Sequence, residues 1–304
     1  MSNLLRRFHP ARVMSKLDQT RRWSAAARQT RARLEAETVA VAVAVRNRCG
    51  PRVDNFLATL RAQSLPPRCI DITVCDFGSD AEPLAELRAS CARFGARLVA
   101  LGVREAEWNK SWGLNAALRL AAPNAKWILA TDIDMLFGPD FIEQLLRAHL
   151  AFEPAIVLCQ FLDLPKEALE QPLDVVAQFE ALRAQGEWVG EHATGPCLST
   201  SRAWCDRVRG FDERMKLWGY MDQDFSDRAI RDRLRPVWIH ERATLLHQWH
   251  PRKFEVHRGD PAQQALMRER YEANRRLWQE DQSIDRNAEG WGELPAGAEV
   301  IEPA

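Results

Sequence analysis

Residues 38–47 read TVAVAVAVRN, and valine alternates with alanine until the charge of Arg46 ends the run. Small and β-branched residues in an uninterrupted apolar run are typical of a strand buried on both faces. Such strands occur where helices cover a parallel sheet on both sides. We therefore expect residues 38–47 to form the first strand of the core.

Strand and helix patterns alternate after this run. Strand-like segments span residues 69–80, 96–103 and 126–134, and helix-like segments span residues 54–64, 83–95, 111–122 and 138–152. This alternation over residues 39–152 predicts an α/β fold with a mostly parallel central sheet flanked by helices. Ligands of such sheets bind beyond the carboxyl ends of the strands, so polar residues there are the first candidates for a site.

The second half of the chain has a looser pattern. It predicts a strand over residues 155–164, a helix over 166–185, a turn-rich stretch with a short helix over 187–211, a helix over 222–234, one or two strands over 235–250 and a helix over 260–281. We expect a basic helical leader at residues 1–38, a main domain at 39–255, and a C-terminal helix with a mobile tail at 256–304. The tail is expected to be mobile because it is rich in Gly, Pro and Glu.

The composition limits the class of protein. The 304 residues carry no net charge, which argues against a nucleic-acid partner. Seven cysteines without a CxxC pair fit reduced thiols in a cytosol. The longest apolar runs fall well short of the roughly 18 residues of a membrane-spanning helix, and the N-terminus lacks the apolar core of a signal peptide. We expect a cytoplasmic protein.

The charge is unevenly distributed, because residues 1–38 contain nine Arg and Lys residues but only three acids. This segment could be a helix that lies on an anionic membrane surface, at the inner face of the membrane, or on a partner. The composition alone favours the alternative, a solvated helix docked on the body of the protein. The apolar side of the helix would be formed by Leu4, Leu5, Phe8, Val13, Met14 and Leu17.

Acidic residues follow the expected strands at three places. Asp76 ends the second strand, Asp132 and Asp134 follow the apolar run WILAT, and Asp222 with Asp224 stands near a later helix start. Two carboxylates one residue apart can hold Mg²⁺ or Mn²⁺, and such an ion can bind a diphosphate. A D-x-D pair alone also arises in surface turns, but its position at the end of an apolar strand favours a metal site.

Two histidines follow a later apolar segment in LLHQWHP, His247 and His250. An imidazole can complete a Mn²⁺ site that two acids begin. Side chains three residues apart on a strand or loop do not point at one ion as readily as they do on a helix. We therefore expect one histidine ligand, while the other could be exposed or bonded to the backbone.

Several segments together resemble the family 2 glycosyltransferases of the GT-A fold: VCDFGSD, WNKSWGLNAAL, ATDIDM, GPCLSTSRAWCDRVRGFDERMKLWGYMDQDFSDRA and LLHQWHP. The resemblance covers roughly residues 38–255, and its later part is similar to galactosyltransferases and chondroitin-polymerase-type enzymes. It implies a nucleotide-binding half at residues 39–152 and an acceptor and catalytic half at 153–255. The implied reaction is an inverting transfer of a sugar from a nucleotide sugar to a hydroxyl of a glycan or other acceptor, and we expect a UDP sugar as the donor.

The resemblance also implies roles for the metal-binding and nucleotide-binding residues. Asp134 would be the direct ligand of Mn²⁺ or Mg²⁺, with Asp132 on the ribose or donor sugar. His247 would give the third ligand, ahead of His250. The nucleotide would be held by Asn47 and Asp76.

The segment WGYMDQDF carries the implied reaction centre. Trp218 and Gly219 would line the sugar pocket, and Asp222 would be the catalytic base. Met221 and Gln223 stand where the family usually has acids that touch sugar hydroxyls, so the identity of the sugar stays open. Asp222 could also cap the helix that follows it, because Asp is common at helix N-caps.

Two other kinds of protein fit parts of this pattern. A nucleotidyltransferase would have a Gly-rich loop after the first strand, but VRNRCGPRVDN contains a single Gly. A non-catalytic sugar-binding module would explain Met221 and Gln223, but Asp132, Asp134, Asp222 and His247 are all retained. The stretch EWVGEHATGP, residues 187–196, is expected to order over the donor.

Overall fold

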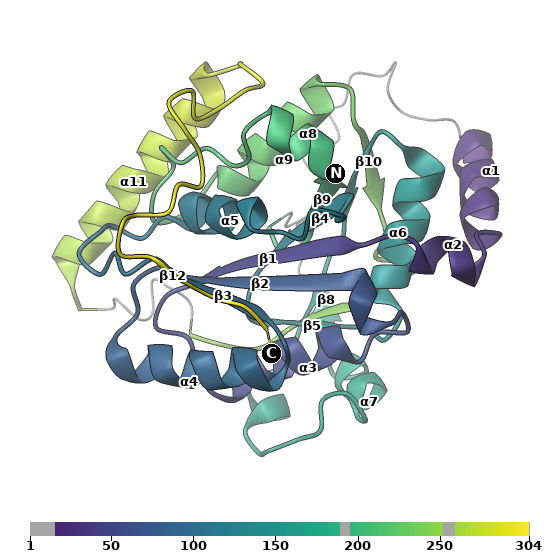
Figure 1. The fold of residues 1–304 in the computed structure, drawn as a ribbon, viewed down its shortest axis with the longest axis horizontal. Helices are drawn as coiled ribbons and strands as arrows, with labels where there is room; N and C mark the ends of the chain where they lie inside the picture. The colour runs from purple at the N-terminus through teal and green to yellow at the C-terminus, as the bar shows by residue number, and fades with distance from the viewer. Residues whose placement is uncertain (1–15, 189–194, 252–258, 304) are drawn as a thin grey trace.

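The computed structural model describes residues 16–188, 195–251 and 259–303 (Figure 1). Its centre is an eight-stranded sheet. In spatial order the strands are β10 (Arg235–Trp238), β6 (Ala155–Leu158), β9 (Leu198–Ser201), β4 (Trp127–Thr131), β1 (Val39–Val45), β2 (Ile70–Asp76), β3 (Arg97–Ala100) and β12 (Glu299–Ile301). β9 and β12 are antiparallel to their neighbours, and the other neighbouring pairs are parallel. The predicted α/β fold with a mostly parallel sheet is confirmed.

Helices cover both faces of this sheet, as Figure 1 shows. One face packs against α3 (Pro51–Arg61), α4 (Ala81–Arg93) and α6 (Phe141–Phe152). The other face packs against α5 (Lys110–Arg119), α8 (Arg202–Arg207) and α9 (Met221–Arg231). The sheet is therefore the middle layer of three, as the strand and helix alternation predicts.

The alternating valines and alanines of β1 lie on opposite faces of the sheet. The valines pack with residues of α3 and α6, such as Phe56 and Leu145. The alanines face α5, which approaches the strand so closely that a β-carbon built at Gly113 would lie 2.7 Å from the β-carbon of Ala44. Larger residues at the alanine positions would push α5 away from the sheet.

A second, four-stranded sheet lies beside the end of β4. Its order is β5 (Met135–Phe137), β11 (Leu245–His247), β7 (Leu162–Asp163) and β8 (Glu187–Trp188). β11 is parallel to β7, and the register pairs His247 with Asp163. In the chain, a short 3-10 helix η3 (Lys166–Leu169) and the short helix α7 (Phe179–Arg183) lie between β7 and β8. The helix predicted over residues 166–185 is therefore wrong except for these two short pieces.

β9 was predicted as part of a turn-rich stretch, but it forms a central strand. Ser199 and Thr200 of β9 are fully buried, and their hydroxyls have hydrogen-bond partners inside the fold. Ser199 Oγ donates to the carbonyl of Ile128 at 2.6 Å and lies 2.7 Å from Nε2 of His149. Because these residues are polar, the segment lacks the apolar pattern by which a buried strand is recognised in a sequence.

The described part of the N-terminal leader is docked on the body. α1 (Lys16–Ala27) packs along α6, and α2 (Arg31–Glu35) follows it. Arg22 donates to the carbonyl of Ala151 at 2.7 Å, and the ring centroids of Trp23 and Phe152 are 4.9 Å apart. Most of the apolar residues proposed for membrane contact lie in residues 1–15, outside the described residues. None of the helices described here combines the length and apolarity needed to cross a bilayer.

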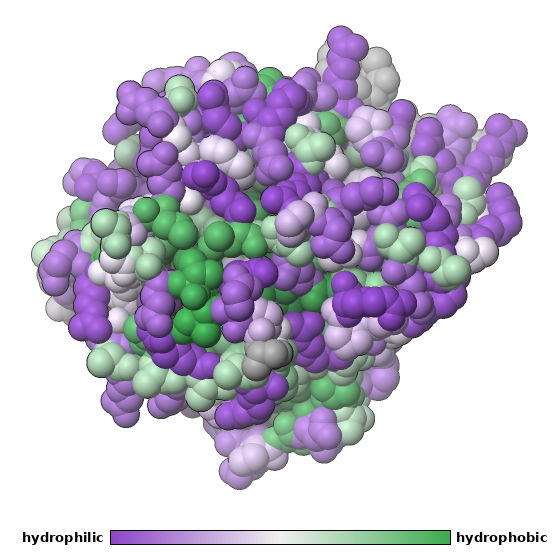
Figure 2. All heavy atoms as spheres, in the orientation of Figure 1, coloured by the Kyte–Doolittle hydropathy of each residue, from purple (hydrophilic) through white to green (hydrophobic). Residues whose placement is uncertain are grey.

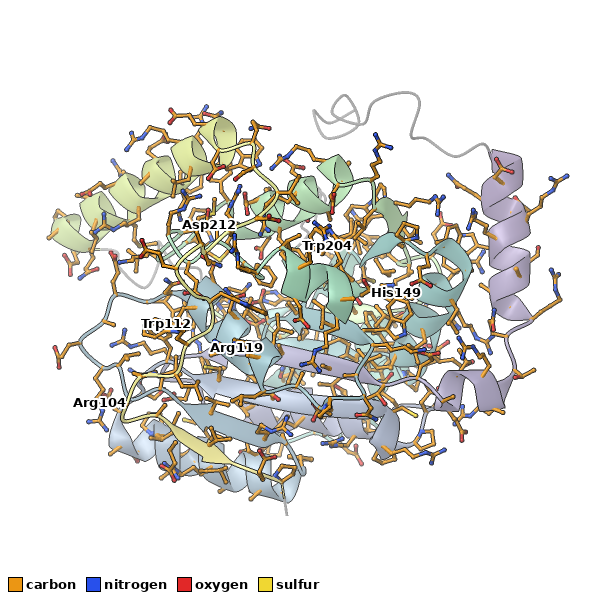
Figure 3. All side chains as sticks on the ribbon, turned by 45° about the horizontal axis from the view of Figure 1, so that its top comes forward. Arg104, Trp112, Arg119, His149, Trp204 and Asp212 are labelled. Carbon is orange, nitrogen blue, oxygen red and sulfur yellow. The ribbon has the colours of Figure 1, made fainter. Side chains whose placement is uncertain are left out.

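The C-terminal segment does not form the predicted mobile tail. After α11 (Pro261–Glu280) the chain crosses α5 and adds β12 to the edge of the sheet beside β3. Trp112 and Arg119 of α5 point toward this segment (Figure 3), and each donates to one of its carbonyls at 2.8 Å. Gly292 lies directly on the backbone of α5, where a β-carbon would be 2.6 Å from Asn115. Glycine here allows close packing, whereas composition alone suggested disorder.

The surface around this segment is mostly hydrophilic. Figure 2 shows a green area left of centre, on the face where the C-terminal segment runs. Leu294 and Val300 of this segment remain partly exposed, although neighbouring Trp291 and Ala298 pack against the core.

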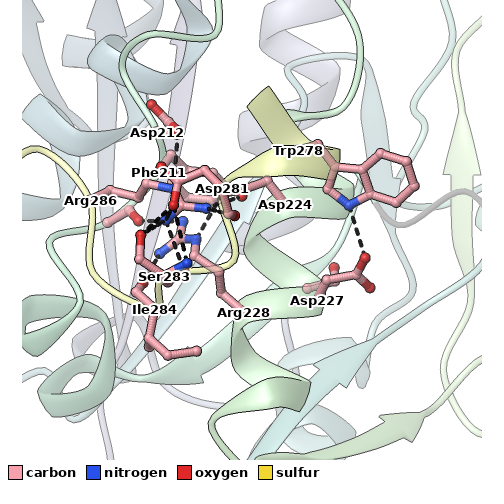
Figure 4. A network of polar contacts seen from close by, with 12 residues as sticks. Phe211, Asp212, Asp224, Asp227, Arg228, Trp278, Asp281, Ser283, Ile284 and Arg286 are labelled. Atoms are coloured by element: carbon pink, nitrogen blue, oxygen red, sulfur yellow. Dashed lines mark hydrogen bonds and ion pairs between the residues drawn. The ribbon is translucent and has the colours of Figure 1, made fainter. Parts of the chain in front are cut away.

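A buried ion network fastens the C-terminal segment to α9 (Figure 4). Asp224 is fully buried and lies 2.7 Å from both Arg228 and Arg286. Arg286 also lies 3.0 Å from Asp212 and 3.3 Å from Asp281. Asp224, which the sequence places beside the expected base, therefore has a structural role.

Candidate active site

Asp132 and Asp134 occupy the turn between β4 and β5, at the carboxyl end of the sheet. Asp134 Oδ2 lies 3.1 Å from Nε2 of His250 and 3.6 Å from Nε2 of His247. One ligand atom from each of the three residues lies within 4.8 Å of the others. Asp134 Oδ1 is buried and has no hydrogen-bond partner among the described residues. Because a buried carboxylate oxygen without a partner is unfavourable, this cluster fits a bound cation.

Both histidines face Asp134, whereas the sequence led us to expect only one. The reason is the turn that follows β11. The amide of Gln248 donates to the carbonyl of Asp134 at 2.8 Å, and its side chain donates to the carbonyl of Arg52 at 3.0 Å. Gln248 is almost fully buried, and this anchored turn brings His250 round to the same carboxylate as His247.

Asp163 orients His247 from the side opposite Asp134. Its Oδ1 lies 2.7 Å from Nδ1 of His247, a pairing set by the parallel register of β7 and β11. A carboxylate on the second ring nitrogen is the usual support of a metal-binding histidine. The sequence did not reveal Asp163, because a single acid in a two-residue strand forms no motif.

The charges of this cluster stabilise one another. Burial tends to lower the pKa of His247, but Asp134 and Asp163 outweigh burial and raise it to about 9. Burial tends to raise the pKa of Asp134, but His247 and His250 outweigh burial and hold it well below its usual range. Asp134 is therefore a carboxylate near neutral pH, the form that a metal ligand needs, whereas His247 would have to release a proton when it binds a cation.

Lys110 joins Asp132 to Asp222. Its Nζ lies 2.7 Å from Oδ1 of Asp132 and 3.7 Å from Oδ1 of Asp222, and its side chain is only 13% exposed. Burial tends to lower the pKa of Lys110, but the two acids outweigh burial and raise it, so the side chain is an ammonium. Sequence reasoning missed this residue. A signal existed, because a lysine in the first turn of a helix opposes the helix dipole and needs another reason to be there.

Asp222 lies in the first turn of α9, and its side chain is 24% exposed. The N-cap position belongs to Tyr220, so the alternative role of Asp222 as N-cap is wrong. Gly195 lies against the Asp222 carboxylate, because a β-carbon built at residue 195 would be 2.5 Å from Oδ2. The end of the stretch 187–196 therefore covers the candidate base, while Gly190 lies outside the described residues.

Trp218 and Gly219 lie next to α11. Trp218 is 40% exposed and stacks on Tyr271, with ring centroids 5.1 Å apart. Met221 is almost fully buried with Met215 and Trp278, so it packs in the core between α9 and α11. The apolar residue at the family's acidic position therefore serves packing.

Asn47 and Asp76 build the turn that follows β2. Asp76 is fully buried, and both of its carboxylate oxygens accept hydrogen bonds from the Gly78–Ser79 turn. Asn47 exchanges side-chain hydrogen bonds with Asp80 at 3.1 and 2.8 Å. These contacts shape the turn at the carboxyl end of β2, and the nucleotide-binding roles of Asn47 and Asp76 stay predictions.

The sequence profile described as glycosyl transferase family 2 matches residues 40–208, which is more than half of the chain. The chain belongs to glycosyltransferase family 2. It has the GT-A fold, and the family match overturns the alternative of a nucleotidyltransferase. A comparison with curated proteins finds no match.

This family 2 glycosyltransferase is similar to two kinds of solved structure. One is S. aureus TarS 1-349 in complex with UDP-GlcNAc, with a TM-score of 0.54 and 14% identity over 72% of this chain and 60% of that chain. Another is the mannosyltransferase PcManGT from Pyrobaculum calidifontis in complex with GDP-Man and Mn²⁺, with a TM-score of 0.52 and 18% identity over 78% of this chain and 66% of that chain. The chain spans 38% of the longer TarS chain.

The family match ends before the later part of the site. Asp222, His247 and His250 all lie beyond residue 208. The similarity of this part to galactosyltransferases and chondroitin-polymerase-type enzymes is not among these matches. The roles of these three residues therefore rest on the geometry of the site.

Proposed function

We propose that this glycosyltransferase transfers a sugar from a nucleoside diphosphate sugar, preferably a UDP sugar, to a hydroxyl of a glycan acceptor with inversion. Asp222 acts as the base. The observation that carries the proposal is the position of Lys110 between Asp132 and Asp222. Through Lys110, the candidate base lies near the edge of the sheet where Asp134 and two histidines would hold a cation.

Asp134, His247 and His250 would hold a divalent cation. One carboxylate with two imidazoles suits Mn²⁺ better than Mg²⁺, which prefers oxygen ligands only. The unpartnered buried oxygen of Asp134 and the support of His247 by Asp163 favour such a site. When bound, the cation supplies positive charge that stabilises the departing nucleoside diphosphate.

The transfer itself is a single displacement. The acceptor oxygen forms a bond to the anomeric carbon, the bond from that carbon to the diphosphate oxygen breaks, and Asp222 accepts the proton of the hydroxyl. The Lys110 ammonium lies 3.7 Å from Oδ1 of Asp222, so it faces the carboxylate that would accept the proton. Lys110 also balances the charge of Asp132, which would bind the ribose or donor sugar.

Trp218 would hold a sugar ring beside the base. Its indole is partly exposed although one side stacks on Tyr271. A flat aromatic surface matches the apolar face of a pyranose. Gly219 would let the chain turn from this platform into the helix that carries Asp222.

Release of nucleotide from a panel of UDP and GDP sugars tests this function. The assay is run with Mn²⁺, with Mg²⁺ and with EDTA. We expect release with at least one donor, greatest with Mn²⁺ and abolished by EDTA. An exposed aspartate, changed in Asp285→Asn, provides a matched control for substitutions in the site. Absence of release with every donor, or equal release in EDTA, would contradict the proposal.

A further inference from the structure

The loop at residues 216–220 has an unusual backbone. Leu217, Gly219 and Tyr220 have φ values of +58°, +95° and +67°. Leucine and tyrosine rarely adopt this left-handed region, because their β-carbons crowd the backbone. Such conformations persist only where the surroundings enforce them, and they concentrate at functional sites. This loop carries Trp218 and leads directly into Asp222.

Asn274 of α11 enforces the shape of this loop. Its Nδ2 donates to the carbonyls of Lys216 at 2.9 Å, Trp218 at 3.1 Å and Gly219 at 3.1 Å. Its Oδ1 accepts from the amide of Lys216 at 3.3 Å. The side chain is almost fully buried, so these backbone groups are its partners instead of water. A side-chain amide is required, because it offers donors and an acceptor at one end.

Tyr271, one turn earlier on α11, supports the same loop. Its ring stacks on Trp218 with an interplanar angle of 24°, and its hydroxyl lies 3.2 Å from that of Tyr220. A β-carbon at Gly219 would be 2.6 Å from the Tyr271 ring. Tyr271 therefore packs against the loop at Trp218, Gly219 and Tyr220.

α11 also contacts the loop that leads to Lys110. Arg270 of α11 donates to Glu107 at 2.8 Å. The same loop is also tied to the chain before residues 216–220, because Asn109 donates to the carbonyl of Glu213 at 2.7 Å. The helix thus lies behind both segments that bring charged groups to the site. It lies entirely outside residues 40–208, the part that matches the family.

We propose that Asn274 and Tyr271 are positioning residues of the transfer reaction, which hold the 216–220 loop so that Trp218 and Asp222 meet the acceptor. The proposal rests on the proposed function of Asp222 and Trp218. Loss of either residue impairs the acceptor side of the reaction, whereas the cation cluster at Asp134 stays intact.

The first test needs no activity. Amide hydrogen exchange is compared for the wild-type chain, Asn274→Ala and a control, Arg275→Ala, which changes an exposed residue of the same helix. We expect Asn274→Ala to speed exchange selectively over residues 216–224, with β1 and β4 unchanged. Wild-type exchange over residues 216–224 would overturn the proposal whether or not the chain is an active enzyme.

The second test measures transfer to simple methyl glycosides at saturating donor. We expect Asn274→Ala to lower kcat/KM for the acceptor by about 100-fold, because small misplacements of reacting groups have effects of this size. Tyr271→Ala should raise the KM for the acceptor. Tyr271→Phe keeps the aromatic ring, so we expect it to have the wild-type KM for the acceptor. Thermal stabilisation by UDP with Mn²⁺ should stay at the wild-type value in all these variants.

A double-mutant cycle separates positioning from general destabilisation. If Tyr271 acts through Trp218, Tyr271→Ala should cause no further rise in acceptor KM in a Trp218→Ala background. Additive effects of the two substitutions, or equal losses of donor and acceptor binding, would overturn the proposal. If the wild-type chain released no nucleotide from any donor, that result would instead contradict the proposed function.

Discussion

Gly195 lies against Asp222 so closely that a β-carbon at residue 195 would be 2.5 Å from Oδ2 of the carboxylate. The contact joins the end of the stretch that precedes β9 to the first turn of α9. The carbonyl of the next residue, Pro196, accepts a hydrogen bond from Thr131 at 2.7 Å, which ties this stretch to the end of β4. The candidate base is therefore in contact with a backbone segment that is hydrogen-bonded to the end of β4.

Gly195→Ala should displace the Asp222 carboxylate. We expect kcat to fall by about 100-fold with little change in the melting temperature, because a small shift of a reacting group is enough for such a loss. Steady-state kinetics and thermal unfolding measure the two quantities. Gly297→Ala is the matched control, since a β-carbon at residue 297 would meet nothing within 4 Å. Wild-type kcat in Gly195→Ala would show that the contact does not matter.

Removal of either histidine should weaken cation binding. We expect His247→Ala and His250→Ala each to raise the Kd for Mn²⁺, measured by calorimetry on the full chain. Asp163→Asn should raise it by about 10 to 100-fold, because the loss of an orienting partner has effects of that order. If His250→Ala bound Mn²⁺ as tightly as the wild-type chain, the ligand set would contain only one histidine.

The buried ion network should contribute strongly to stability. Arg286→Met leaves the buried carboxylates of Asp212 and Asp224 without one of their positive partners. Breaking a buried pair in this way costs about 3 to 5 kcal/mol, whereas Arg275→Met, at an exposed pair, should cost about 0 to 1 kcal/mol. Urea unfolding measures both values. Equal losses for the two variants would contradict a structural role of the network.

His149 should make stability fall in mild acid. Its Nε2 lies 2.7 Å from Oγ of Ser199, whose hydroxyl donates to the carbonyl of Ile128, so the ring donates its Nε2–H to Ser199. Burial lowers its pKa from 6.5 to about 3. Between these values the unfolded chain binds a proton that the folded chain does not, so stability decreases as pH falls from 6.5 toward 3.

The size of this effect follows from the two pKa values. At pH 5 the histidine should reduce the free energy of unfolding by about 2 kcal/mol relative to pH 7. We expect His149→Gln to remove this part of the pH dependence in urea unfolding at the two pH values. If His149→Gln lost as much free energy of unfolding between pH 7 and pH 5 as the wild-type chain, the effect would belong to other groups.

The features that the sequence could predict depend on local pattern. Alternating valine and alanine marked β1, and an apolar run followed by Asp132 and Asp134 marked the edge of the sheet where ligands bind. Each of these signals is contained in fewer than about ten neighbouring residues, which is the range over which hydrophobic periodicity is informative. The family resemblance rested on the same short segments.

The features that the sequence alone could not predict depend on contacts between segments far apart in the chain. Asp163 meets His247 only because β7 and β11 pair in one register, and His250 turns to Asp134 only because Gln248 is anchored. Lys110 becomes a candidate site residue only because it lies close to Asp222, which is more than a hundred residues later in the chain. Side-chain patterning along one segment carries no information about such partners.

Single-turnover transfer by Asp222→Asn tests the central claim most directly. The variant and the wild-type chain are compared at saturating nucleotide sugar, Mn²⁺ and acceptor, with stabilisation by UDP and Mn²⁺ as the measure of an intact donor site. We predict unchanged stabilisation and a rate of transfer lower by about 10² to 10⁴-fold, the usual contribution of a general base. A wild-type rate in Asp222→Asn would contradict the role of Asp222 as the base.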